Sequence, residues 1–171
     1  SVVYGLLRSR FHDSCILRDR MRGMTVTHGS TVLRRRFVRV ITRRAGSSTG
    51  TTSVVAAARL AHEELIAALS PLIGGVAVEA LWERAFVLVQ REYPAEERRG
   101  ENHTPDEPFA RVTLWLERQD ETIATDAAAA IFATFAELLA ALIGEPLTTR
   151  YLKKAYGGVF SINGPPGRKN R

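Results

Sequence analysis

Histidine and cysteine are the side chains of this chain best suited to catalysis or metal binding, and they are few. The four histidines are His12, His28, His62 and His103, and the one cysteine is Cys15. No histidine lies in an HExxH motif, and none has a second histidine at the spacing of a metal site. A single cysteine forms no intrachain disulfide and no metal cluster. We therefore predict no catalytic residue, no metal site and no cofactor.

The two histidines of residues 52–156, His62 and His103, have acidic neighbours. His62 precedes Glu63 and Glu64 in an expected helix, and a His–Glu pair can carry out acid–base chemistry. A solvated helix face is the simpler interpretation, and we favour it. His103 lies in an acidic loop with Asp106, but the spacing is not that of a calcium loop. Neither histidine therefore indicates an active site.

Six arginines within eleven residues form the one cluster in the sequence whose chemistry suggests a function, which is phosphate binding. They are Arg34, Arg35, Arg36, Arg39, Arg43 and Arg44. Their guanidinium groups would contact phosphates in a salt-dependent way, and Phe37 between them can stack on a base. The acidic middle of the chain argues against a dedicated nucleic-acid module. Nucleic-acid binding through this cluster is therefore an alternative function and not the leading one.

Charge is segregated along the chain, and the formal net charge of +6 hides this. Residues 1–45 hold eleven arginines and two acids, residues 46–150 hold eight arginines and sixteen acids, and residues 151–171 hold five basic groups and no acid. An acidic middle is thus flanked by two basic ends. This pattern indicates contact with nucleic acid or an anionic membrane surface, or self-association through opposite charges.

The basic N-terminal region has no sustained hydrophobic period and is expected to be a disordered arm. Residues 1–23 precede Met24, and we interpret them as upstream translated sequence or an expression remnant, with a native basic targeting or binding arm as the alternative. Residues 31–44 fit a short strand or a few basic helical turns. Residues 46–53 are rich in Gly, Ser and Thr, as linkers are. We therefore assign residues 1–51 to an arm and linker that contribute little to stability.

From residue 52 to residue 156 the sequence predicts a small all-α bundle of about five helices. Apolar residues recur there at spacings of three and four, which is the pattern of a helix with one buried face. Glycine and proline mark the helix ends, because glycine adopts a left-handed cap at low cost and proline donates no backbone hydrogen bond. The expected helices cover residues 52–73, 76–93, 108–119, 125–143 and 146–156. Residues 157–171 are expected to form a flexible basic tail.

Two segments of the predicted bundle match at an offset of seventy residues. Residues 72–86 and 142–156 both begin with Leu-Ile-Gly, and each follows one expected helix and starts another. We interpret them as related helical hairpins that cover each other's apolar faces, with chance similarity as the alternative. Over residues 65–86 and 135–156 the chain resembles small helical domains of bacterial signalling proteins. This resemblance implies a regulatory or adaptor role and carries over no functional residue.

The second predicted helix has more apolar residues than one thin core can cover. One row along it consists of Trp82, Phe86, Val89 and Tyr93, and the neighbouring row consists of Leu81, Ala85 and Leu88. We predict that the aromatic row stays partly exposed and binds a partner helix, because Trp and Tyr often dominate the energy of interfaces. The alternative is that the third predicted helix covers this row through Val112 and Trp115.

These observations favour a non-enzymatic helical regulatory or protein-interaction module that binds a protein partner or forms a homodimer. A nucleic-acid-associated protein is one alternative. A small ligand-binding bundle, or an enzyme whose site is assembled from scattered residues, is another. No apolar run approaches the roughly 20 residues of a membrane span, and no signal peptide is recognisable. We therefore expect a bacterial, cytoplasmic protein without a membrane span.

Overall fold

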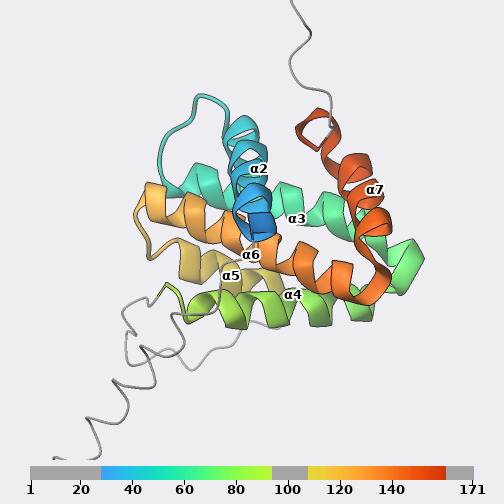
Figure 1. Ribbon diagram of the computed structural model, residues 1–171. Coiled ribbons are helices and arrows are strands. Elements are labelled where there is room, and N and C mark those ends of the chain that lie inside the picture. Colours follow the sequence, from blue (N-terminus) through green and yellow to red (C-terminus); the bar gives the residue numbers. More distant parts are fainter. Residues whose placement is uncertain (1–27, 94–107, 161–171) are drawn as a thin grey trace, which may run out of the picture.

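The computed structural model describes residues 28–93 and 108–160, which fold as a bundle of helices (Figure 1). The helices are α2 (His28–Ala45), α3 (Thr51–Ile73), α4 (Gly75–Gln90), α5 (Pro108–Leu116), α6 (Glu121–Ile143) and α7 (Glu145–Tyr156), and a 3-10 turn, η2 (Gly157–Val159), follows α7. No strand occurs in the described residues, which confirms the all-α bundle. The described residues hold six helices instead of about five, because residues 28–45 also form one.

A long helix, a glycine and a second helix occur twice in this order. α3 and α6 are each 23 residues long, and each is followed by a glycine, Gly74 or Gly144. The backbone angles of the two glycines agree closely, with φ 83° and ψ 148° at Gly74 and φ 87° and ψ 151° at Gly144. Each glycine N–H donates to the carbonyl oxygen four residues earlier at 2.9 Å. A side chain would be strained at such a positive φ, so the predicted glycine stops are confirmed.

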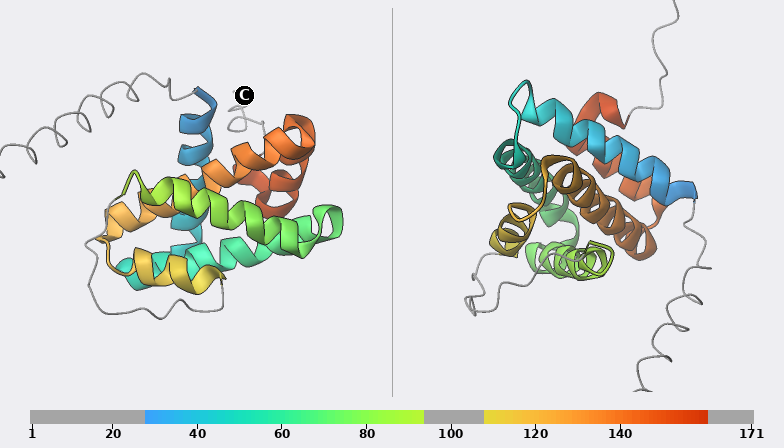
Figure 2. Two further views of the ribbon diagram at one scale, coloured as in Figure 1. Left: turned by 90° about the horizontal axis from the view of Figure 1, so that it is seen from below. Right: turned by 90° about the vertical axis from the view of Figure 1, so that its left-hand side faces the viewer.

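The two hairpins, α3–α4 and α6–α7, pack onto each other reciprocally. α4 lies along α6, α7 packs against α3, and α3 and α6 contact each other between them (Figures 1 and 2). Of the helices that precede the hairpins, α2 packs mainly on α6, whereas α5 contacts α3, α4 and α6 about equally. α6 and α7 begin seventy residues after α3 and α4, respectively. This reciprocity is what two copies of one unit produce around a pseudo-twofold axis, and it supports the interpretation of a duplication.

Helix α6 is the centre of the bundle, and every other described helix contacts it. Its buried residues include four consecutive alanines at positions 127–130. Among the described helices, α6 is also long and apolar enough to cross a membrane by length and composition alone, with 56% of the tested window buried inside the bundle. The core helix of a soluble protein passes the same test.

Helix α2 belongs to the core, which corrects the prediction of a disordered arm for residues 28–45. Phe37, Val40 and Ile41 are fully buried. The Phe37 ring stacks on Phe132 of α6 with 5.3 Å between the ring centroids. The strand alternative for residues 31–44 is therefore wrong, and the packed region begins near residue 28. The expectation that everything before residue 51 contributes little to stability does not fit this packing, because removing α2 would open the core.

The last described residues are anchored to the same aromatic cluster. Phe160, which follows η2, is fully buried, and its ring centroid lies 5.1 Å from that of Phe37 and 5.8 Å from that of Tyr156. Residues 157–160 are therefore packed and are not part of a flexible tail. The expectations about residues 1–27 with His12 and Cys15, about His103 and its acidic loop, and about the tail from residue 161 lie outside the described residues.

Candidate functional site

The partner surface predicted on α4 is mostly core. Trp82, Phe86 and Val89 are at most 2% exposed, and Tyr93 is half-buried. Phe86 meets Trp115 of α5 edge to face, with 5.4 Å between the ring centroids. The prediction of a free aromatic row is therefore wrong, and the alternative, in which the third predicted helix covers that row, is correct.

The outward face of α4 lies in the foreground in the left view of Figure 2. Only part of the neighbouring row belongs to it, since Ala85 is fully buried whereas Leu81 and Leu88 lie toward this side. Val76 is 82% exposed, Val87 40% and Leu88 38%. Between them lie Ala77, Ala80, Leu81 and Arg84, and of these Ala80 and Arg84 are exposed and the other two half-buried. Arg84 is the one charged residue of this row. We name these seven residues the α4 outer face, and it is apolar over nearly its whole length.

Two of the arginines predicted to contact phosphate form ion pairs within the protein. Arg34 donates to both carboxylate oxygens of Asp126 on α6, at 2.9 Å from Nε and 2.5 Å from Nη2. The Tyr93 hydroxyl donates to the same carboxylate at 2.8 Å. Arg44 forms an ion pair with Glu64 of α3. These contacts join α2 to the two long helices, α6 and α3, so Arg34 and Arg44 contribute to the packing of the bundle.

The other four arginines of the cluster differ in where they point. Arg36 lies over the ring of Phe160 at 5.6 Å from the ring centroid. Arg35, Arg39 and Arg43 are exposed and four residues apart, which places them in one stripe along the solvent side of α2. We name these three residues the α2 stripe. The structure thus divides the predicted cluster into ion-paired arginines, one arginine on an aromatic ring and an outward stripe.

His62 is buried in an aromatic cluster, which corrects the prediction of a solvated helix face. Its ring centroid lies 4.3 Å from that of Trp82 and 4.8 Å from that of Phe109. Burial, together with the nearby charge of Arg59, lowers the pKa of His62 from 6.5 to about 4. Its Nε2 atom has no hydrogen-bond partner in the structure. His62 is therefore a neutral core residue at neutral pH, and in the described part of the chain no group of three or more metal-ligating side chains gathers around any point.

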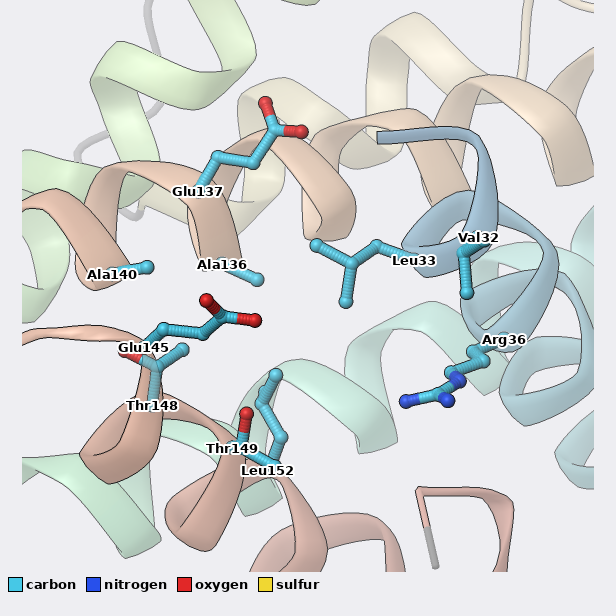
Figure 3. A pocket seen from close by; sticks show the side chains of 10 residues that line it. All are labelled: Val32, Leu33, Arg36, Ala136, Glu137, Ala140, Glu145, Thr148, Thr149 and Leu152. Atoms are coloured by element: carbon cyan, nitrogen blue, oxygen red, sulfur yellow. The ribbon is translucent and has the colours of Figure 1, made fainter. Parts of the chain in front are cut away.

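A groove with a volume of about 740 Å³ opens between α2, α6 and α7 (Figure 3). Arg36 points into it from α2, and Glu145 and Thr149 point into it from α7, while the carboxylate of Glu137 is turned away from its middle. The full lining consists of Val32, Leu33, Arg36, Ala136, Glu137, Ala140, Glu145, Thr148, Thr149 and Leu152. Sequence reasoning missed this groove, because no pattern along the chain places α2 beside α7.

Comparisons of this chain with protein-family models, with curated proteins and with solved structures give no significant match. The likeness of the two hairpins to bacterial signalling domains remains a resemblance.

Proposed function

We propose that this chain is a non-enzymatic interaction module that pairs with a second copy of itself through the α4 outer face. The observation that carries the proposal is the exposure of Val76, Val87 and Leu88 along one side of a helix whose other side is already core. Apolar residues on both the buried and the outward side are typical of a helix that has protein on both sides. An exposed apolar strip of this kind is also typical of interaction sites.

The α4 outer face is suited to a second copy because it is self-complementary. In an antiparallel pair of α4 helices with a twofold axis near residue 82, Ala80 lies opposite Arg84 of the second copy, and Val76 lies opposite Leu88. The small Ala80 leaves room for the Arg84 side chain. Both copies would make each of these contacts, as a twofold axis requires.

Sedimentation velocity of the full chain over a range of micromolar concentrations tests the pairing. We expect a dimer for the unchanged protein and at least about a tenfold weaker association for Val87→Glu, which buries an unpaired charge. Leu60→Glu is the matched control, because Leu60 is 52% exposed on α3 and lies outside the proposed contact. A monomeric unchanged protein, or an equal effect of the control, would overturn the proposal. Binding of the monomer to lipid vesicles through Val87 would also contradict it.

A charge introduced at position 80 tests the register. We expect Ala80→Glu, which places a carboxylate opposite Arg84 of the second copy, to strengthen the dimer, and Ala80→Arg, which places two guanidinium groups opposite each other, to weaken it. Equal effects of the two variants would mean that the two helices do not pair antiparallel around residue 82.

The α2 stripe supports a second candidate function, which is phosphate contact with nucleic acid. Arg35, Arg39 and Arg43 are exposed, and their spacing directs three guanidinium groups to one side. Fluorescence anisotropy of a labelled DNA duplex at several salt concentrations tests this function. Arg39→Gln should weaken binding to unrelated sequences alike and reduce the salt slope by about 1. Arg150→Gln is the control, because Arg150 is exposed on α7. Binding that is unchanged by Arg39→Gln would remove this candidate.

A further inference from the structure

We propose that the groove between α2, α6 and α7 binds a small zwitterion, with its carboxylate at Arg36, its ammonium group at Glu145 and an apolar body between Leu33 and Leu152. This inference goes beyond the proposed pairing and uses a different surface. It rests on three observations, which are the charge at each side of the groove, the chemistry of its lining and its size.

Arg36 is suited to hold a carboxylate. Its guanidinium points into the groove (Figure 3), and the ring of Phe160 supports it at 5.6 Å. In contrast to Arg34 and Arg44, it forms no ion pair with any residue that the structure describes. A planar guanidinium binds a carboxylate through two parallel hydrogen bonds. An anionic group of a ligand would therefore meet a guanidinium group that no described residue holds in an ion pair.

Glu145 and Thr149 form the opposite side of the groove. Glu145 is the first residue of α7, and Thr149 follows one helical turn later, so both side chains lie on the same face. Figure 3 shows the carboxylate and the hydroxyl directed into the groove. Oxygen acceptors of this kind hold an ammonium group. The negative charge of Glu145 also disfavours phosphates and other dianions, which selects a zwitterion over a purely anionic ligand.

The wall between these two ends is apolar and leaves space. Leu33 and Leu152 face the groove from α2 and α7, and Ala136 and Ala140 line it with small side chains from α6. The volume of about 740 Å³ falls within the roughly 300–1,000 Å³ typical of sites for small molecules. The groove therefore suits a compact molecule with an apolar middle.

NMR titration of the ¹⁵N-labelled full chain with linear ω-amino carboxylates of increasing length tests the proposal. We expect amide signals of the groove to shift in a saturable manner with at least one member of the series. Linear carboxylates and linear amines of the same lengths should bind at least about tenfold more weakly, because each lacks one charge-assisted hydrogen-bonded end. Equal affinity for the carboxylate alone, or no saturable shift with any of the series, would overturn the proposal.

Variants at the two ends sharpen the test. Arg36→Met and Glu145→Gln should each reduce the affinity for the best ω-amino carboxylate by about tenfold or more, and Glu145→Gln should leave the affinity for the matching carboxylate unchanged or raised. Arg39→Met is the control, because Arg39 lies on the solvent side of α2. Val87→Glu should leave ligand binding intact, so that loss of pairing and loss of ligand are distinguishable. Insensitivity to both groove variants would show that the ligand binds elsewhere and overturn the assignment.

Discussion

Helices α4 and α7 occupy equivalent places in the two hairpins, since they begin seventy residues apart, yet they direct different side chains inward. Trp82 of α4 corresponds to Leu152 of α7. The indole of Trp82 packs on His62 and on Phe132, with ring centroids 4.3 Å and 4.9 Å away. Leu152 has no such bulk and lines the groove. One hairpin thus has an aromatic ring where the other has a buried leucine at the edge of the groove.

The outward sides of the two helices differ as well. Ala80 and Arg84 of α4 correspond to Arg150 and Lys154 of α7, and all four are exposed. The outer side of α7 is therefore basic at both positions. On α4, only Arg84 of the equivalent pair is charged, and exposed valines flank the pair. The duplicated glycine turn therefore fixes the backbone, whereas the side chains around it differ between the two hairpins. The proposed pairing face and the proposed ligand groove both lie where the two hairpins have diverged.

We expect the largest loss of stability from exchanging the residue types of Trp82 and Leu152. Trp82→Leu leaves a cavity among four aromatic rings and should lower the free energy of unfolding by about 3 kcal/mol. Leu152→Trp should cost less, about 1–2 kcal/mol, because Leu152 is 2% exposed but borders the groove, into which part of a larger ring can extend. Urea unfolding of both variants gives the two values. Equal losses would mean that the groove side is packed as tightly as the Trp82 side.

The glycine stops and the all-α bundle were predictable because a local pattern dictates them. A glycine at the end of an apolar stripe is a signal within a few residues of sequence, and Gly74 and Gly144 both follow it. The place of α2 was harder to predict. Phe37 and Ile41 have helical spacing, but the arginines around them resemble an exposed arm, and only Asp126 and Glu64, distant in sequence, neutralise two of them.

The side chains of the candidate sites were harder to predict, for two physical reasons. On α4, both rows are apolar, so periodicity does not tell which row α5 covers, and the contact between Phe86 and Trp115 decides it. His62 has acidic neighbours, yet it lies on the stripe of Ala58 and Leu65 and is therefore buried. The groove depends on the approach of α2 to α7, which only the tertiary structure reveals.

A pH titration of stability distinguishes the two hairpins at a single position. His62 corresponds to Phe132, and burial lowers its pKa from 6.5 to about 4. The unfolded chain takes up the proton first as the pH falls, so the stability contributed by neutral His62 is complete above pH 6.5 and declines as the pH decreases toward 4. Between pH 7 and pH 5 the loss should be about 2 kcal/mol.

The variant His62→Phe copies the other hairpin and should remove this part of the pH dependence. Urea unfolding of both proteins at pH 7 and pH 5 measures the difference. Parallel pH profiles would show that His62 takes up its proton as readily in the folded protein as in the unfolded chain.

The two glycines should respond alike, which tests the likeness of the hairpins instead of their difference. Gly74→Ala and Gly144→Ala place a Cβ at a φ of +83° and +87°, and no atom comes closer to either new Cβ than Pro146 Cδ, at 3.8 Å from that of Gly144. Backbone strain alone therefore sets the cost, about 1–2 kcal/mol in each case. Thermal unfolding gives the two values side by side. A clear difference between them would mean that one turn is held by contacts that the other lacks.

Asp126 provides the smallest test, because the equivalent position in the first hairpin is Ala56, which is exposed. Asp126 accepts hydrogen bonds from Arg34 and from the Tyr93 hydroxyl, so it joins α2 to α6 and to the end of α4. Asp126→Ala gives the second hairpin the residue that the first hairpin has at this position. The ion pair is partly exposed, so solvent screens it, and the expected loss is less than about 1 kcal/mol. The loss should shrink at high salt, as screening weakens the attraction.

A double-mutant cycle checks that Arg34 acts through Asp126. Arg34→Met should lower the free energy of unfolding by a similar amount, and adding it to Asp126→Ala should have little further effect, because the pair is already broken. Additive losses in this double-mutant cycle would show that Arg34 stabilises α2 through its stem and not through Asp126.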